Sequence, residues 1–284
     1  MGRPNLRPAI AERIHTIAAH LEAASNALAE VAADALETPG NAVRAACDLI
    51  SVGWLGDVVA SFSDLAAAAV KAVLGAAGGS AAGAVRMAGG AIMRDTRLLT
   101  QGAADVGASV TGGVLSVGAA AVSGVQVLTL FERSSRRLTA DELSVLRGIF
   151  GRSISFFNVR VVDGRAGVFD VNNRPFTRNN RIYLKGGGMQ TLVHECVHVW
   201  QYQHHGTRYM GDALGAQVFV EDAYNWEREF TRGKTKWNEF NAEAQAAFID
   251  ALYAYGEPTD HAEPAREALA VIRSARNFRL SSRL

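Results

Sequence analysis

The first forty residues place an apolar side chain alternately four and three positions apart, which is the spacing of one face of a helix. Pro8 suits the entrance of such a helix, and Pro39-Gly40 predicts its end. We expect this apolar seam to pack against other helices of the chain. Its members are Ile10, Ile14, Ile17, Leu21, Ala24, Leu28, Val31 and Ala35.

Residues 42–131 are rich in alanine and glycine and contain few charges. No charged residue occurs between Asp105 and Glu132, a stretch long enough to cross a bilayer. Because Ala, Gly, Ser, Thr and Val contribute little transfer free energy, we predict a tightly packed soluble hairpin or bundle, with conditional membrane insertion as the alternative. Small residues also recur at every fourth position, which lets helix backbones approach closely. These runs are Gly75, Gly79 and Gly83, and Gly112, Ser116, Ala120 and Gly124.

The polar and basic run 132–137 indicates a boundary, and a second unit begins after it. Thr139 and Glu142 have the spacing of a capping box and predict a helix that continues to Phe150. Segments typical of strands follow, and an edge strand of such a sheet can hold an extended peptide by backbone pairing. The expected strands are 154–162, 168–171 and 181–184, separated by the turns Asp163-Gly164, Asn172-Asn173 and Asn179-Asn180.

The stretch from Met189 to Gly206 has the pattern of a buried helix with one polar face. Gly186-Gly187-Gly188 predicts a break before this helix, and Gly206 predicts its end. The polar face carries His194, His198 and Gln201, and the apolar face carries Met189, Leu192, Val193, Cys196, Val197 and Trp200.

The five residues from His194 to His198 have the H-E-x-x-H order of zinc-dependent hydrolases. Positions four apart on a helix lie nearly in line, so both imidazoles can reach one metal ion at about 2.0 to 2.1 Å. Glu195 is placed beside the metal, where it can take a proton from a zinc-bound water as a general base. Cys196 points off this face, and we interpret it as a small buried apolar residue.

A catalytic zinc ion needs a third protein ligand, and the residues after the motif offer several. Segment 212–228 predicts a helix, the basic turn 232–236 predicts a solvated loop, and 237–255 predicts a further helix. From residue 256 onward we expect a short, charged, peripheral segment. The candidate third ligands are Glu239, Glu243, Asp222 and the pair His204-His205, and the pair lies too far along the helix axis to close around the same ion.

The composition narrows the functional classes. The chain has 284 residues, a net charge of +1 and 49% hydrophobic residues, which suits two folded units and gives no bulk attraction to nucleic acid. The two cysteines, Cys47 and Cys196, are too few for a disulfide framework. No signal peptide is visible, so we expect a cytoplasmic protein or one exported by a non-classical secretion system.

Residues 138–255 resemble the small H-E-x-x-H metallopeptidase domains of bacterial contractile-injection and polymorphic-toxin systems, the DUF4157-like or Vgr-related zinc proteases. The resemblance implies a gluzincin-like site with zinc as cofactor and Glu243 as the third ligand, because such families carry a downstream Asn-x-Glu-x-Gln-Ala segment. Asn241 and Gln245 flank Glu243 here, and we expect them to make contacts that orient its carboxylate. The matching segments are the helix 138–150, Phe157-Asn158-Val159-Arg160-Val161, Pro175-Phe176-Thr177 before Ile182-Tyr183, 192–201, and Asn241-Ala242-Glu243-Ala244-Gln245-Ala246.

The combined expectation is a mainly α fold with a small β-sheet, divided into an Ala/Gly-rich helical region (1–137), a zincin-like domain (138–258) and a C-terminal tail (259–284). We predict a zinc metallopeptidase that acts on a peptide or protein substrate, as a bacterial effector or toxin associated with a secretion or injection apparatus. The alternatives are a membrane-active, pore-forming protein with an accessory metal domain, and a structural zinc domain without turnover. The candidates for stabilising the oxyanion are Tyr202, Tyr209, Tyr253, Tyr255 and His205.

Overall fold

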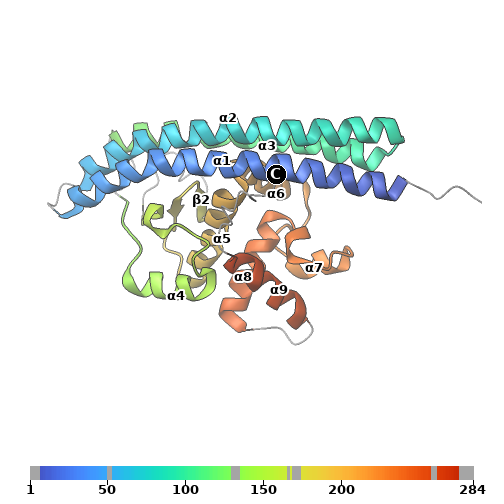
Figure 1. Ribbon diagram of the computed structural model, residues 1–284. Helices are drawn as coiled ribbons and strands as arrows, with labels where there is room; N and C mark the ends of the chain where they lie inside the picture. Colours follow the sequence, from blue (N-terminus) through green and yellow to red (C-terminus); the bar gives the residue numbers. More distant parts are fainter. Residues whose placement is uncertain are drawn as a thin grey trace, which may run out of the picture.

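The computed structural model describes residues 7–49, 53–128, 135–164, 167, 174–256 and 261–274. Its three longest helices run side by side as a layer, and the smaller elements pack against one side of this layer (Figure 1). The fold is mainly helical with a small three-stranded sheet, as the sequence predicts. The layer consists of α1 (Arg7–Leu49), α2 (Gly53–Met93) and α3 (Thr96–Leu128), with α2 packed against both of the others.

The first helix differs from the sequence prediction in its length, because α1 continues through Pro39-Gly40 instead of ending there. Gly40 lies so close to α2 that a Cβ atom at this position would be 2.3 Å from Ser63 Oγ. This close packing continues on both sides of the proline and offsets the backbone hydrogen bond that proline cannot make.

The apolar seam of α1 is oriented differently from our prediction. The large side chains of Ile17 and Leu28 are 53% and 60% exposed, whereas alanines, among them Ala29 and Ala33, are buried. The interface with α2 uses small side chains because the two backbones approach closely. The larger apolar residues are therefore left on the outer surface of the layer.

The recurrent small residues of α2 and α3 lie at close contacts, as predicted, although the contacts are of two kinds. A Cβ atom on Gly83 would lie 2.5 Å from the carbonyl oxygen of Gly102, so this position joins α2 to α3. A Cβ atom on Gly112 would lie 2.2 Å from the carbonyl oxygen of Thr207, and the Ser116 hydroxyl bonds to Asn179, so these two positions face the smaller elements. They fix α3 against the unit that carries the candidate site.

The second unit begins with the helix that the capping box predicts. The Thr139 hydroxyl accepts a hydrogen bond from the Glu142 backbone, and the Glu142 carboxylate accepts one from the Thr139 backbone. Two later predicted helices are each interrupted, since segment 212–228 contains a turn and Asn241 begins a new helix after a 3₁₀ turn. The helical elements are α4 (Ala140–Phe150), η1 (Phe156–Asn158), α5 (Met189–His205), α6 (Arg208–Phe219), α7 (Trp226–Thr231), η3 (Trp237–Glu239), α8 (Ala242–Tyr255) and α9 (Ala262–Arg273).

The small sheet has the strand order β1-β3-β2, with β1 parallel and β2 antiparallel to β3. Its strands are β1 (Arg160–Val162), β2 (Phe176–Arg178) and β3 (Arg181–Tyr183). Of the predicted strand 154–162, only residues 160–162 form a strand. The predicted strand 168–171 lies outside the described residues. β2, which the sequence analysis did not predict as a strand, forms one edge of the sheet.

One hydrophobic core unites α4, the strands β1 and β3, α5, α8 and α9. Ala265, Ala268 and Ile272 of α9 are completely buried in this core, so residues 262–273 are not the peripheral segment that the sequence analysis expected. The regular spacing of these three residues on one helix face explains their burial. The predicted division of the chain into domains stays a prediction.

Buried charges connect the helical layer to the rest of the chain. Lys71 of α2 forms an ion pair with Glu30 of α1, and its ammonium group lies 3.7 Å above the ring centre of Tyr202 in α5. Arg208 of α6 contacts Asp105 of α3 at 2.8 Å and Glu22 of α1 at 2.5 Å. These contacts fix the register of the long helices against the smaller elements.

We predict that Lys71→Met lowers the free energy of unfolding by about 3 to 5 kcal/mol, because Glu30 remains buried without its ammonium partner. The double variant Lys71→Met/Glu30→Met should recover most of this loss, since both charges are then removed. Urea denaturation, monitored by circular dichroism, measures the free energy of unfolding of both variants. Equal stability of the single variant and the parent would contradict the assigned role of this pair.

Candidate metal centre

The predicted histidine helix forms the centre of the site. α5 begins after Gly188 and ends at His205 before Gly206, as the sequence predicts. The apolar face of α5 lies in the hydrophobic core, where Cys196 is completely buried. Burial raises the pKa of the Cys196 thiol well above its usual value, which agrees with an inert apolar role. His194 and His198 consequently face the opposite side, toward a cleft.

The structure brings His194, His198 and Glu243 together. One carboxylate oxygen of Glu243, Oε2, lies 3.5 Å from His194 Nε2 and 3.4 Å from His198 Nε2. The ligand atoms of the three residues lie within 4.8 Å of one another. Two imidazole nitrogens and one carboxylate oxygen therefore converge from two helices, α5 and α8.

The other nitrogen of each imidazole is engaged in a hydrogen bond. His194 Nδ1 donates to Asp250 Oδ2 at 2.7 Å, and His198 Nδ1 donates to Gln201 Oε1 at 2.8 Å. Gln190 in turn donates to the second oxygen of Asp250 at 3.1 Å. These bonds turn both Nε2 atoms toward Glu243 and set the tautomer that leaves Nε2 free to bind a metal.

Glu195 is held apart from the three converging groups. It is buried, and its Oε2 atom lies 2.9 Å from the hydroxyl of Thr177, which is also 3.0 Å from the Glu195 backbone carbonyl. Thr177 belongs to the edge strand β2. The sheet thus fixes the orientation of the carboxylate, and burial raises the pKa of Glu195 above its usual value.

The charges of the site perturb both histidines in the metal-free chain. Burial alone would lower the pKa of His194, but hydrogen bonds to Asp250 and Glu243 outweigh it and raise this pKa to about 10. Burial alone would also lower the pKa of His198, but the nearby Glu243 carboxylate outweighs this effect and raises the pKa. The negative potential that favours a proton at these nitrogens also favours a metal cation in its place.

The start of α8 positions Glu243. Asn241 caps this helix, since its side-chain oxygen accepts hydrogen bonds from the backbone N–H groups of Glu243 and Ala244, both at 3.0 Å. Glu229 holds Asn241 from the other side, accepting from its backbone N–H at 3.2 Å and its side-chain amide at 3.3 Å. Glu243 therefore takes its place through the backbone of the first helical turn.

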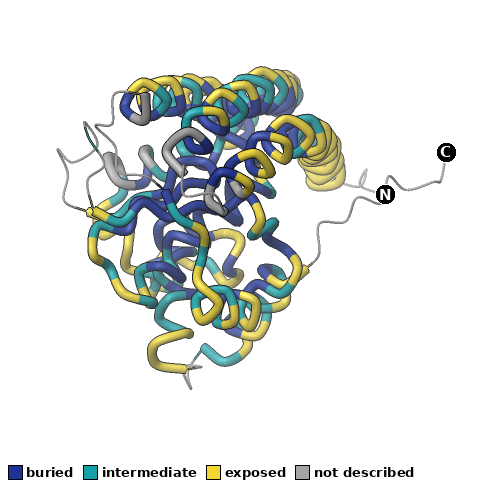
Figure 2. Tube along the Cα trace, turned by 90° about the vertical axis from the view of Figure 1, so that its left-hand side faces the viewer, coloured by how far each residue is buried: buried dark blue, intermediate teal, exposed yellow. Residues whose placement is uncertain are grey.

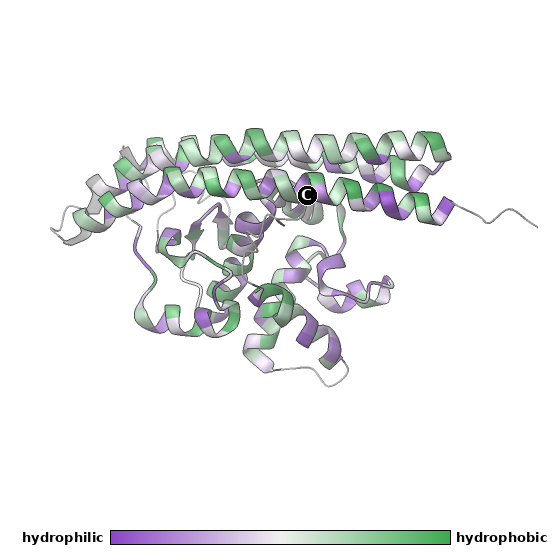
Figure 3. Ribbon diagram, in the orientation of Figure 1, coloured by the Kyte–Doolittle hydropathy of each residue, from purple (hydrophilic) through white to green (hydrophobic). Residues whose placement is uncertain are grey.

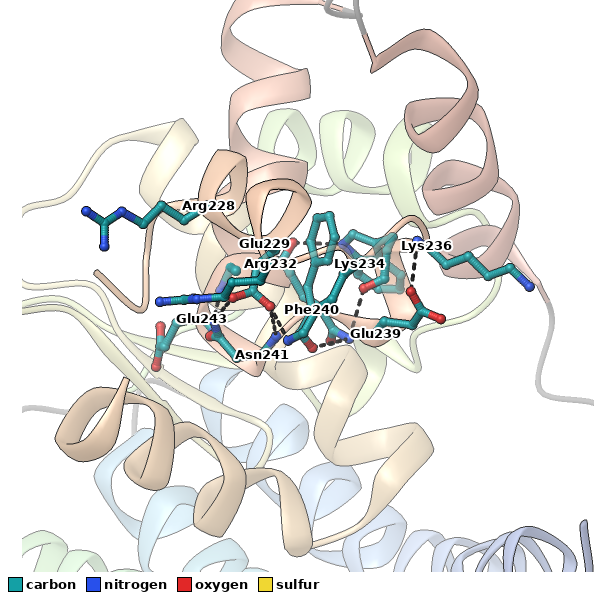
Figure 4. A network of polar contacts seen from close by, with 12 residues as sticks. Arg228, Glu229, Arg232, Lys234, Lys236, Glu239, Phe240, Asn241 and Glu243 are labelled. Carbon is teal, nitrogen blue, oxygen red and sulfur yellow. Dashed lines mark hydrogen bonds and ion pairs between the residues drawn. The ribbon is translucent and has the colours of Figure 1, made fainter. Parts of the chain in front are cut away.

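Figure 4 shows how the basic turn 232–236 supports this arrangement, with Glu229 between the turn and Asn241. Arg232 contacts Glu229 at 2.5 Å, and Lys234 also pairs with it. Burial alone would raise the pKa of Glu229, but these two cations lower it and keep the carboxylate charged. The turn 232–236 is largely exposed, as predicted, but two of its cations also neutralise a buried acid, a role that the prediction did not include.

The flanking residues of Glu243 act differently from our sequence-based expectation. Asn241 contacts the Glu243 backbone and not its carboxylate. The Gln245 amide accepts from Gln201 at 2.8 Å and bonds to backbone carbonyls near Trp237. Both residues set the position of α8, and thereby that of Glu243.

The other candidate ligands lie elsewhere. Glu239 precedes α8 and accepts hydrogen bonds from the backbone N–H groups of Thr235 and Lys236. Asp222 lies in an exposed turn, 3.3 Å from Arg228, and His204 contacts the backbone of Ser153 at 3.0 Å. None of the three, nor His205, belongs to the converging group within the described residues.

A cleft of about 700 Å³ opens in front of the three converging residues and Glu195. Of the predicted oxyanion candidates, only Tyr209 lines it, and its hydroxyl donates to the Thr177 carbonyl at 3.1 Å. Tyr202 lies instead beneath Lys71, and Tyr255 is 84% exposed on α8. Tyr224, which lies inside the segment 212–228 that was predicted to be one helix, also lines the cleft and stacks on His194.

Sequence reasoning missed three contributors to the site. Asp250 lies two helical turns after Glu243 on the same face of α8, and this spacing is a signal that could have identified it. Thr177 depends on strand pairing, for which no local signal exists. Tyr224 was missed because the predicted helix 212–228 concealed the turn that presents this side chain to the cleft.

The donor set suits a zinc ion. Four ligands at about 2.05 Å from zinc in a tetrahedron lie about 3.3 Å from one another. The two separations between Glu243 and the histidines, 3.4 and 3.5 Å, are close to this value. Two imidazole nitrogens and one carboxylate oxygen would leave a fourth position of a bound zinc ion for water, which is the composition of catalytic zinc sites.

Comparison with known proteins gives one partial similarity. The chain is 29% identical over 138 residues to the type VI secretion system spike protein VgrG2b of Pseudomonas aeruginosa, a match that covers 44% of this chain. It spans only 13% of the length of that spike protein. No family model matches the chain, and no solved structure matches it. The chain is thus distantly related to a Vgr protein of a bacterial secretion system.

Proposed function

We propose that this protein is a zinc-dependent metallopeptidase. The observation that carries the proposal is the convergence of His194 Nε2, His198 Nε2 and Glu243 Oε2, with Glu195 held separately beside them. A structural zinc site needs four protein ligands, whereas three ligands and a buried carboxylate beside them suit a hydrolytic site. This arrangement agrees with the resemblance of residues 138–255 to H-E-x-x-H and DUF4157-like metallopeptidase domains.

A bound zinc ion would polarise the scissile carbonyl and acidify a water molecule. Glu195 is the general base that takes the proton of the water and returns it to the leaving amine. Burial raises the pKa of Glu195 toward neutral pH. A group whose pKa lies nearer the working pH can both accept and donate a proton efficiently. Thr177 holds the carboxylate during both transfers. Tyr224 is the phenol of the cleft best placed to stabilise the developing oxyanion, because the Tyr209 hydroxyl already donates its proton to the Thr177 carbonyl.

The cleft suits an extended peptide. Arg174, Pro175, Phe176 and Thr177 line one side of it, and the last two belong to the edge strand β2. An edge strand offers backbone groups that pair with a substrate chain, which places a peptide bond along the cleft in front of Glu195. Peptide and protein substrates therefore fit the site better than small molecules.

The similarity to a spike protein supports an effector role, in which the chain is delivered by a type VI secretion apparatus. The match spans a small part of the spike protein, so we propose only an association with such an apparatus and delivery by it.

We predict that Glu195→Gln retains about one zinc ion per chain but lowers peptide cleavage by about 100-fold or more, because the general base is removed while the ligands remain. Cleavage of fluorescently labelled casein and metal analysis of the same sample measure both quantities. Glu263→Gln, an equivalent change at an exposed position of α9, is the control. Parental turnover in Glu195→Gln would refute the peptidase assignment.

The assignment of the third ligand predicts different results for two glutamates. Glu243→Ala should lose bound zinc on dialysis and should lose activity, since only two ligands remain. Glu239→Ala should keep both, because this carboxylate only caps a 3₁₀ turn. Equal zinc retention in Glu243→Ala and the parent would exclude Glu243 as a ligand.

The cap of α8 predicts an indirect effect on metal binding. Asn241→Ala removes the hydrogen bonds that fix the first turn of α8 and should weaken zinc binding about tenfold, with a loss of about 1 kcal/mol in stability. Asn241→Ser, which restores a capping oxygen, should recover part of the affinity. Competition with a chromophoric chelator measures the affinity, and parental zinc affinity in Asn241→Ala would contradict the positioning role.

A further inference from the structure

The outer face of the helical layer is apolar along its length. In Figure 2 the exposed residues of the long helices lie on the side away from the smaller elements, and Figure 3 shows mostly hydrophobic residues on α2. Large apolar side chains are among the exposed residues, so this is more than a stripe of small residues. The most exposed are Phe62 at 62%, Val73 at 69% and Ile92 at 84% in α2, and Val114 at 69% and Val125 at 60% in α3.

Apart from the start of α1, where Arg7, Glu12 and Arg13 are exposed, most charged residues of the same helices point the other way. Among the side chains described between residues 21 and 126, the exposed charged ones are Arg94 and Arg97, both at the turn between α2 and α3. The other charged side chains are buried or half-buried, and several form ion pairs inside the layer. These pairs include Glu30 with Lys71, Arg44 with Asp57, and Arg86 with Asp105.

This distribution is the inverse of a soluble helical bundle and is typical of helices in contact with lipid, where ionisable groups face the protein interior. α2 and α3 each contain a segment long and apolar enough to cross a membrane, Gly56–Met93 and Thr96–Gln126. Only 33% of the most apolar window in each is buried, so most of each window lies on the surface of the molecule.

One end of the apolar face is cationic. Gly89 near the end of α2 lies against Ile14 of α1, which brings the start of α1 beside the turn between α2 and α3. Arg13, Arg94 and Arg97 are all exposed at this end and outnumber the exposed acid Glu12 beside them. Cations beside an apolar surface suit anionic lipid headgroups next to acyl chains.

We propose that the outer face of α1, α2 and α3 is a docking surface for an anionic lipid bilayer, with the helices lying in the interface. The opposite side of α1 and α3 holds the metal-site unit through buried polar contacts, so these helices offer lipid one face only. A second copy of this chain would present the same apolar face with the same arginines. Two copies therefore bring no acidic cluster that could pair with these arginines, whereas an anionic bilayer does. The proposal is independent of peptidase activity.

Co-flotation of the purified full-length chain with vesicles tests the docking surface. The parent should float with vesicles of phosphatidylcholine and phosphatidylglycerol, and more weakly with phosphatidylcholine alone. Val73→Glu/Ile92→Glu should lower the partition coefficient about tenfold or more, because two charges enter the apolar contact. Tyr255→Glu, at an equally exposed apolar position on α8, is the matched control and should float as the parent does.

The cationic end is tested separately. Arg97→Glu should reduce binding to the anionic vesicles by about fivefold or more, since each basic residue near an anionic surface contributes about this factor. Its binding to phosphatidylcholine alone should change little. Circular dichroism and thermal unfolding establish that each variant is folded without any reference to activity, so a loss of flotation is separable from a failure of the peptidase assignment.

Three results would overturn the proposal. The first is a folded parent that does not float with anionic vesicles. The second is parental flotation of Val73→Glu/Ile92→Glu. The third is a lipid-free dimer of the parent, seen by analytical ultracentrifugation and lost in this double variant, which would assign the face to a second copy.

Discussion

The side-chain amide of Gln201 joins the two helices that carry the candidate site. Its oxygen accepts from His198 Nδ1, and its nitrogen donates to the Ala242 carbonyl at the start of α8 and to Gln245. One planar group therefore sets the tautomer of His198 and the position of the first turn of α8. Glu243 is the second residue of that turn, so its distance from both imidazoles depends on this bond. A Gln side chain suits the task because it accepts and donates at the same time.

The sequence could predict the parts of the site that depend on local geometry. His194, Glu195 and His198 lie within two turns of one helix, and the helical period alone determines which of them share a face. Glu243 came from a resemblance, because nothing local ranks it above Glu239. Thr177 could not be predicted, since its contact with Glu195 requires a strand pairing and the packing of a sheet edge on α5. The role of Glu229 could not be predicted either, because the sequence does not show which buried acid the cations of the turn 232–236 contact.

The helical layer shows why a hydrophobic pattern can assign a helix correctly and its faces wrongly. The apolar seam of α1 was expected to point inward on the assumption that water covers the other face. In the structure the inward face carries alanines for close approach and charged residues such as Glu30 and Arg44 that find partners inside. Buried ion pairs contribute little net stability, but losing one partner is costly, so they favour a single register between long helices that have otherwise uniform surfaces. A stripe of alanine and glycine alone would permit sliding.

The β2–β3 turn connects this layer to the chemistry of the cleft. Asn179 accepts from Ser116 of α3 at 2.8 Å, and Asn180 donates to Glu37 of α1 at 2.6 Å while accepting from Gln203 of α5 at 2.7 Å. Thr177, which orients Glu195, lies two residues before this turn. Within α3, Leu115 lines the cleft while its neighbour Val114 is exposed on the outer face. The cleft and the outer face are therefore about one helix diameter apart, about 10 Å. A bilayer on that face would hold the proposed catalytic residues close to the lipid surface, so substrates at a membrane would be the most accessible ones.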